Sequence, residues 1–210
     1  MRKSIAAIAG MLMLLIMPGL VSAQDTFYPG GYYNSIGGMN PVGHISIDTI
    51  HAAGNSNITR LASSIPANVT TPVLLTTFAG QPDVARNVIV TPSGAVTGSL
   101  KITGVNIAGS AFNETVSWSS SSTAKSTTGA FKTVTKIEGT FTQSTLQTLD
   151  IGTGTALGLN TMLPYNTSLL VAVGGAKASA TISTNAAVLA ENTVTVSSPG
   201  GSDVVVYYIV

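Results

Sequence analysis

Short runs in which apolar and polar β-forming residues alternate most constrain the fold of this chain of 210 residues. Val, Ile, Thr and Leu recur at alternate positions, and Gly, Asn, Ser and Pro separate the runs. Beyond residue 73 the turns come at spacings of roughly 8 to 12 residues, as in antiparallel all-β domains. The pattern predicts an all-β fold, a β-sandwich of the Ig-like or jelly-roll-like kind over residues 73–210, with an extended N-terminal arm.

The expected strands cover most of this domain. By residue number they are 73–78, 87–91, 99–103, 105–108, 112–118, 131–138, 146–151, 168–173, 177–183, 192–197 and 203–210. Gly174-Gly175 predicts a two-residue hairpin turn, and residues 198–202 predict a terminal hairpin. The last strand is almost wholly apolar, so it must be covered on both faces or donated to a neighbour.

Residues 1–23 are typical of a secretory signal peptide. A basic start precedes an apolar run over residues 5–21, and small residues at 21–23 form a cleavage site, so we expect cleavage before Gln24. The alternative is a retained membrane anchor, because the apolar run is nearly long enough to cross ~30 Å of hydrocarbon. Pro18-Gly19 followed by Ser-Ala favours cleavage, after which no membrane segment is expected.

Residues 24–72 are expected to form an extended arm that contains one or two strands. Its first part, residues 24–43, is called the aromatic segment here because it combines glycine pairs and prolines with the rings of Phe27, Tyr28, Tyr32 and Tyr33. Such rings contribute much buried area at little cost in entropy, so they could dock on a neighbouring subunit. The alternative is a linker whose rings cover its own domain.

Strict alternation from His44 to Ile50 predicts a half-buried strand, with Ile45 and Ile47 on one face and His44 and Asp48 on the other. A metal or acid/base pair is conceivable at this spacing, but without a third ligand a solvated strand face is favoured. Residues 52–72 suggest a long connection with room for one helical turn over 60–63. Whether residues 44–72 join the main sandwich or a separate lobe is left open.

Composition and motifs argue against several classes of function. Nine basic and eight acidic side chains give a net charge of +1 without a basic cluster, so nucleic acid is not an expected partner. Cysteine is absent, so stability must come from sheet packing, assembly or a bound ion. The motifs of serine hydrolases, zinc proteases, P-loop proteins and Rossmann domains are missing, which predicts no enzyme, no metal and no cofactor.

Four local patterns carry structural expectations. Asp83 and Arg86 are placed to form an ion pair that fixes a loop. Trp118 is expected to be a core or strand-edge anchor, and the Ser/Thr tract over residues 117–128 an exposed hairpin tip. The glycines over residues 151–159 look weakly like a phosphate loop, but no Lys-Ser/Thr and no helix follow, so a β-turn is favoured.

Four Asn-x-Ser/Thr sequons are candidate N-glycosylation sites, and each would require an exposed asparagine. They are Asn57, Asn68, Asn113 and Asn166. Asn113 falls within an expected strand, where a glycan would place its side chain on the solvent face.

The order of several motifs resembles a family of uncharacterised β-rich virion structural proteins of tailed phages, prophages and archaeal viruses. The resemblance covers about residues 73–210, through PDVARNVIVT (82–91), ITGVNIAG (102–109), AFKTVTKIE (130–138), DIGTGTALGL (150–159) and ENTVTVSSPGGSDVVVYYIV (191–210). It implies a virion or surface structural role and no catalytic residues.

These observations predict a non-enzymatic structural protein with subunit contacts in a virion or an extracellular surface assembly. The expected partners are like subunits in a homo-oligomer or lattice, and the expected location is extracellular. The signal peptide adds an exported pilus, sheath or envelope-associated protein with the same domain. A second class is a secreted adhesin-like module that recognises glycan or a cell surface through loops such as Ser119–Thr128. An enzyme centred on His44 and Asp48 is the third.

Overall fold

The computed structural model describes residues 45–70 and 72–209. Ile47–Tyr207 form one compact unit. Of the second unit, Met1–Ser46 with Tyr208–Val210, the described residues are the outer ends of two strands, 45–46 and 208–209. The expected signal peptide and the aromatic segment lie outside the described residues.

The described chain is almost entirely β-structure, which confirms the predicted fold class, and its strands form three sheets. The first sheet has the order β3 (Val73–Leu75), β8 (Thr133–Phe141), β5 (Val96–Val105), β6 (Ala111–Ser121). The second has the order β12 (Thr181–Ser183), β13 (Thr193–Thr195), β9 (Gln147–Gly158), β4 (Arg86–Pro92), β7 (Lys125–Phe131), and β2 (Asn57–Ala67) also pairs with β9. The third has the order β1 (Ile45–Ala53), β14 (Ser202–Ile209), β10 (Ser168–Val173), β11 (Ala176–Lys177). A single turn of 3-10 helix, η1 (Leu189–Glu191), precedes β13.

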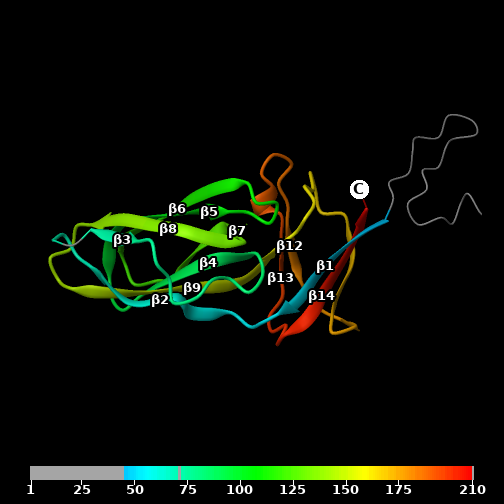
Figure 1. The fold of residues 1–210 in the computed structure, drawn as a ribbon, viewed down its shortest axis with the longest axis horizontal. Helices are drawn as coiled ribbons and strands as arrows, with labels where there is room; N and C mark the ends of the chain where they lie inside the picture. The colour runs from blue at the N-terminus through cyan, green and yellow to red at the C-terminus, as the bar shows by residue number, and fades with distance from the viewer. Residues whose placement is uncertain (1–44, 71, 210) are drawn as a thin grey trace, which may run out of the picture. The chain divides into compact units, whose positions relative to one another are not determined.

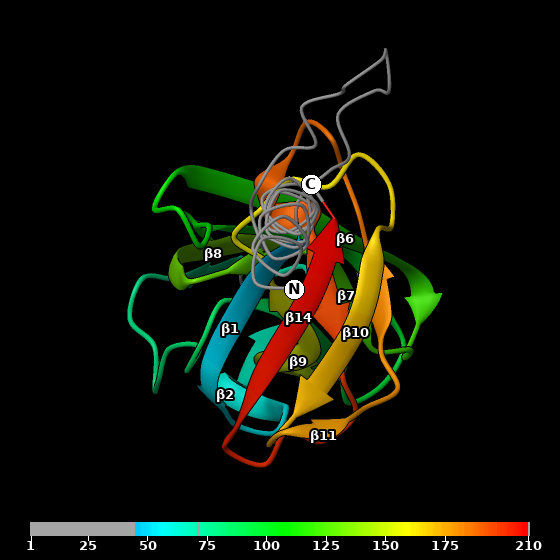
Figure 2. The same ribbon diagram turned by 90° about the vertical axis from the view of Figure 1, so that its right-hand side faces the viewer.

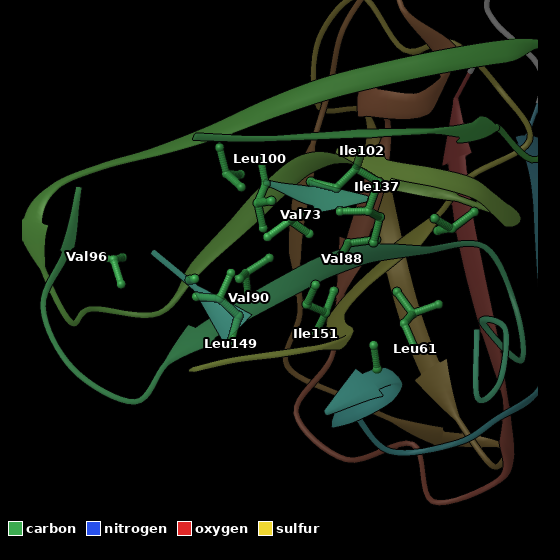
Figure 3. Packing of buried hydrophobic residues seen from close by; sticks show 14 of the residues in the cluster. Leu61, Val73, Val88, Val90, Val96, Leu100, Ile102, Ile137, Leu149 and Ile151 are labelled. Carbon is green, nitrogen blue, oxygen red and sulfur yellow. The ribbon is translucent and has the colours of Figure 1, made fainter. Parts of the chain in front are cut away.

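The first two sheets form a sandwich (Figure 1). Fully buried side chains from both sheets meet between the layers; they include Leu100, Ile102, Ile137, Val88, Val90, Leu149 and Ile151 (Figure 3). Each fully buried Val, Leu or Ile stabilises the fold by about 1.5–3 kcal/mol relative to an exposed one. Trp118 is buried in the same cluster, and its indole Nε1 donates to the Thr123 carbonyl at 2.9 Å, which confirms its expected role as an anchor.

Strand β2 replaces the connection and helical turn expected over residues 52–72, and that expectation was wrong. Its Ala- and Ser-rich sequence has little β-propensity, but pairing with β9 and burial of Leu61 and Ala62 in the core override it. The strand is irregular, because its register shifts twice along β9 and Ser64 adopts a φ of 54°. Whether residues 44–72 join the main sandwich or a separate lobe was left open above. For β2 the answer is the main sandwich, since it contributes to the core.

Strand β9 runs straight through the glycine-rich residues expected to form a turn, so that expectation was also wrong. A Cβ atom on Gly152 would lie 1.9 Å from the Asn57 carbonyl oxygen of β2, and one on Gly154 would lie 2.4 Å from Asn87 Oδ1. The glycines therefore allow β2 and the Asn87 side chain to approach the strand closely, rather than reversing the chain.

Two sets of expected strands have other bounds in the structure. The expected strand 99–103 is part of a longer strand, β5, which ends at Val105 and pairs with β6 and β8, whereas residues 106–108 of the expected strand 105–108 lie in the turn to β6. The expected strand 131–138 is instead divided at Lys132: β7 pairs with β4 in one sheet, and β8 pairs with β5 in the other.

The Glu114 carboxylate joins the open edges of the two sheets. Its oxygens accept the backbone N–H groups of Thr128 at 2.6 Å and Gly129 at 3.0 Å. A side chain of β6 thus satisfies donors on β7 that no neighbouring strand pairs.

The Gly174-Gly175 hairpin was predicted correctly. Both glycines have positive φ, 57° and 83°, and Val173 pairs with Ala176 across the turn. The predicted terminal hairpin was wrong, since β13 pairs with β12 and β9 while β14 lies between β1 and β10 in another sheet. The apolar last strand is therefore a central strand, with Val204 and Val206 fully buried.

The expected orientation of β1 was wrong as well. Asp48 and Ile50 point inward and are buried, whereas Ile47 is 56% exposed and Ile45 is also exposed. Alternation fixed which side chains share a face but not which face the protein covers. The more apolar positions at the start of the strand point outward.

Candidate functional site

Arg86 is a fully buried cation at the start of β4, and the Asp83 carboxylate neutralises it. Its Nε lies 2.7 Å from Asp83 Oδ1, its Nη1 donates to the Gly154 carbonyl at 3.1 Å, and its Nη2 donates to the Gly54 carbonyl. Asp83 Oδ2 also accepts the Gly54 N–H at 2.7 Å. The predicted pair is confirmed, and it ties the β1–β2 turn to β4 and β9.

Opposing effects act on the pKa of Asp83. Partial burial raises the pKa, but hydrogen bonds from Arg86 and from the Gly54 backbone, together with the charge of Arg86, outweigh it. The net pKa lies below the ordinary aspartate value. The carboxylate is therefore ionised and committed to Arg86, which indicates a structural role.

A cavity of about 420 Å³ opens beside this ion pair. It gathers residues from β1, from the segment before β4, from the β5–β6 and β7–β8 turns and from the end of β9; they are Thr49, Ile50, His51, Gln81, Pro82, Asp83, Val84, Ala85, Ile107, Lys132, Thr133, Gly158 and Asn160. Pockets for small ligands typically measure about 300–1,000 Å³. The cavity is large enough for a compact ligand or a protruding side chain.

Most polar groups around the cavity already have partners. Gln81 bonds both backbone groups of Val134, at 2.9 and 3.0 Å, and Asn160 donates its backbone and side-chain N–H groups to Asp48 at 2.6 and 3.0 Å. The Lys132 ammonium differs, because no hydrogen bond or ion pair holds it among residues 45–70 and 72–209. The cavity therefore combines apolar walls with one uncompensated positive charge.

The outward side of the third sheet is apolar. The His51 ring lies 3.1 Å from the Asp203 carboxylate, so these two side chains share a face. Alternation along the strands then places Ile47 and Thr49 of β1 and Val205 and Tyr207 of β14 on that face, while Asp48, Ile50, Val204 and Val206 point inward and are buried.

These four outward residues, Ile47, Thr49, Val205 and Tyr207, are called the outer face here. Figure 2 looks onto this sheet. Strand β10 borders β14, and both its Leu169 and Leu170 are exposed. Since successive side chains alternate, one of these leucines extends the outer face.

The His51–Asp203 pair closes one end of the outer face. The pKa of Asp203 lies below its ordinary value, first because the Ala52 backbone N–H donates to it at 2.8 Å and second because of the hydrogen bond with His51. Both side chains of the pair are largely exposed, so they form a polar border to the outer face.

The predicted His44–Asp48 pair stays a prediction. His44 lies outside the described residues, and Asp48 is buried against Asn160, not on a solvated face as expected. Within residues 45–70 and 72–209, no group of three or more His, Asp or Glu side chains is arranged to hold a metal ion.

The four sequons lie at accessible positions. Asn57, Asn113 and Asn166 are exposed and Asn68 is half-buried, and Asn113 points outward from β6 as the sequence required. In the other three, the asparagine Oδ1 accepts the hydroxyl of the Thr or Ser two residues later, at 2.6–3.1 Å. Glycosylation at these sites stays a prediction.

The Ser/Thr tract is largely exposed, as expected, but most of it belongs to two strands of different sheets. Strand β6 continues to Ser121 and β7 begins at Lys125, whose Nζ donates to the Ser117 carbonyl at 2.5 Å. The predicted assembly residues Phe27, Tyr28, Tyr32 and Tyr33 lie outside the described residues.

Sequence reasoning missed the cavity and the outer face. The cavity collects residues that are up to about a hundred positions apart, and no spacing in the sequence links Ile50, Val84 and Lys132. The outer face was obscured because Ile47 is apolar and was therefore expected to be buried.

No protein-family model matches the chain, and comparison with curated proteins finds no match. A chain in a structure of infectious bursal disease virus, Gx strain, aligns with 84% of this chain at 12% identity and a TM-score of 0.21. The alignment spans 44% of that viral chain. A TM-score of this size does not establish a common fold. Among the described residues, no helix is long and apolar enough to span a membrane.

Proposed function

We propose that this chain is a non-enzymatic structural protein that associates with like subunits through the outer face. The observation that carries the proposal is the apolar character of that face, where Ile47 is 56% exposed beside the half-buried Val205 and Tyr207. A contiguous apolar patch exposed on a sheet is typical of a protein–protein contact. Association would remove these side chains from water.

The setting that we propose is a virion or an extracellular surface assembly. The resemblance of the motif order to that of β-rich virion proteins and the signal-like residues 1–23 support it. The side-chain bonds of the sandwich also favour a structural role, because Arg86, Asp83 and Glu114 all hold segments of the chain together.

The adhesin-like alternative is less well supported by the loop on which it depends. Trp118, the aromatic ring nearest to Ser119–Thr128, points into the core and cannot serve as a sugar platform. Glycan-array binding that disappears when residues 119–128 are replaced would favour the adhesin over our proposal.

The outer face is tested by the variant Ile47→Glu. A carboxylate at this position would have to be desolvated on association, so we expect the oligomer to dissociate. Sedimentation velocity over a range of concentrations measures the change. Leu74→Glu is the matched control, since Leu74 is 64% exposed on β3 of the sandwich.

The expected result is loss of oligomer in Ile47→Glu and retention in Leu74→Glu. A wild-type chain that stays monomeric at the highest concentrations would contradict the proposal. Equal behaviour of the two variants would also contradict it, because the outer face would then have no special part in association.

A further inference from the structure

We propose that the cavity of each subunit receives Phe27 from a second copy of the chain, with Asp25 of that copy beside Lys132. This inference rests on the proposed function, because it requires association between like subunits. It adds a specific contact to the outer face: a side chain from the aromatic segment, residues 24–43, that enters the cavity.

The size and walls of the cavity suit an aromatic ring. Its volume of about 420 Å³ exceeds the ~150 Å³ of an apolar cavity that holds benzene, so a phenyl ring fits with part of its backbone. Ile50, Pro82 and Ala85 are buried and provide apolar walls, and Val84 and Ile107 are half-buried. A phenyl ring brings no polar group that these walls would leave unsatisfied.

Charge distinguishes this occupant from an arbitrary apolar side chain. The other titratable side chains around the cavity, Asp83 and His51, are engaged with Arg86 and Asp203. Lys132 therefore remains the unmatched charge there. In the aromatic segment, Asp25 has the sole charged side chain, so one free cation on the cavity corresponds to one carboxylate on the proposed occupant.

The spacing of Asp25 and Phe27 suits this arrangement. Residues i and i+2 of an extended chain project to the same side, about 6.6–6.8 Å apart. Tyr28 precedes Pro29, which favours an extended backbone at this point. On such a chain Asp25 and Phe27 would project to one side and Tyr28 to the other, as the proposed contact requires.

Position favours a second copy over the same chain as the source of the segment. Thr49 lines the cavity and also belongs to the outer face, so the cavity borders the surface at which we propose that subunits meet. Ile45 lies twenty positions after Asp25, a length that spans up to ~70 Å when extended. The chain is long enough to reach a neighbouring subunit.

A charge exchange tests the proposed ion pair in the full chain. Asp25→Lys and Lys132→Asp should each raise the dissociation constant of the oligomer about tenfold or more, and the double variant should recover most of the wild-type affinity. Lys101→Asp, at an exposed position on β5, controls for the change in net charge. The N-terminus of each variant is read by mass spectrometry, because Asp25 lies next to the expected cleavage site.

The ring is tested by Phe27→Ala with Tyr28→Ala as its matched control. We expect Phe27→Ala to weaken association about tenfold or more and Tyr28→Ala to have a smaller effect. Val84→Trp fills the cavity from a half-buried position and should weaken association similarly. Mixing Phe27→Ala with Val84→Trp should restore pairing, since one chain supplies the cavity and the other the ring.

This inference would be overturned if all cavity and segment variants associated like the wild type while Ile47→Glu dissociated. The proposed function would then remain in place. The inference would also be overturned if the Asp25→Lys/Lys132→Asp double variant, or the mixture of Phe27→Ala with Val84→Trp, did not recover association. This outcome covers the case in which the segment occupies the cavity of its own chain. Strictly monomeric wild-type protein would instead contradict the proposed function itself.

Discussion

At the scale of single residues, one buried asparagine organises the segment between β12 and β13. Asn192 is fully buried; its Oδ1 accepts the backbone N–H groups of Leu163 at 2.9 Å and Asn185 at 3.0 Å. Its Nδ2 donates to the carbonyls of Asn185 at 2.8 Å and Val188 at 3.0 Å. The side chain therefore replaces the pairing that a regular strand would supply.

Replacing this residue by a leucine of similar size should lower the free energy of unfolding substantially. Asn192→Leu leaves several buried backbone groups without partners, each costing about 1–3 kcal/mol, so we expect a loss of at least ~3 kcal/mol. Urea denaturation measures it. Asn55→Ala, which removes one exposed bond to Gly200, should cost only about 0.5 kcal/mol, and a similar loss in both variants would contradict the role of Asn192.

The Arg86–Asp83 pair predicts how stability depends on pH. Because the folded pKa of Asp83 is lowered, its stabilising contribution is present above the unfolded pKa, near 4, and is lost as pH falls through the folded pKa. Asp83→Asn should destabilise the protein at pH 7 by roughly 2 kcal/mol. This is less than the ~3–5 kcal/mol expected for a fully buried pair, since the Asp83 side chain is 22% exposed.

The same variant should reduce, without abolishing, the fall in stability between about pH 5 and pH 2, because the pKa of Asp203 is also lowered. Thermal unfolding across this range, with wild type and variant in parallel, provides the measurement. An identical slope in the two proteins would show that Asp83 does not titrate as its contacts imply.

At the scale of elements, β9 depends on a glycine at its crossing with β2. Gly152→Ala would place a methyl group 1.9 Å from the Asn57 carbonyl oxygen, so one strand must move and stability should fall by about 3 kcal/mol. Gly94→Ala is the control, because the added methyl would meet the amide end of Gln147, a side chain that can rotate away. Hydrogen exchange should show lost protection in β2 specifically; unchanged protection there would exclude the proposed clash.

At the scale of the whole molecule, the proposed assembly predicts where the protein is found. We expect it to sediment as a high-mass species in a density gradient of culture medium, followed by mass spectrometry. Co-banding with nuclease-protected DNA would indicate a virion component, and banding with envelope or DNA-free filaments would indicate an exported surface protein. Recovery at the top of the gradient as free monomer would contradict both forms of the proposal.

Several features followed from sequence alone because their causes are local. Alternation predicted the all-β class, and the Gly174-Gly175 pair predicted the hairpin in which both glycines have positive φ. The three-residue spacing of Asp83 and Arg86 predicted their ion pair. Strand 168–173 was predicted with its observed bounds. In each case a few neighbouring residues contain all the information that the feature needs.

The tertiary structure decided what depends on distant partners. It made a strand of the Ala- and Ser-rich residues of β2, and it separated β13 from β14 into different sheets. It also turned Ile47 outward and Asp48 inward, and brought Ile50, Val84 and Lys132 to one cavity. Local propensities differ by about 1 kcal/mol per residue, whereas burial and sheet pairing with distant strands contribute more in total, so these contacts determined the strands, their faces and the candidate site.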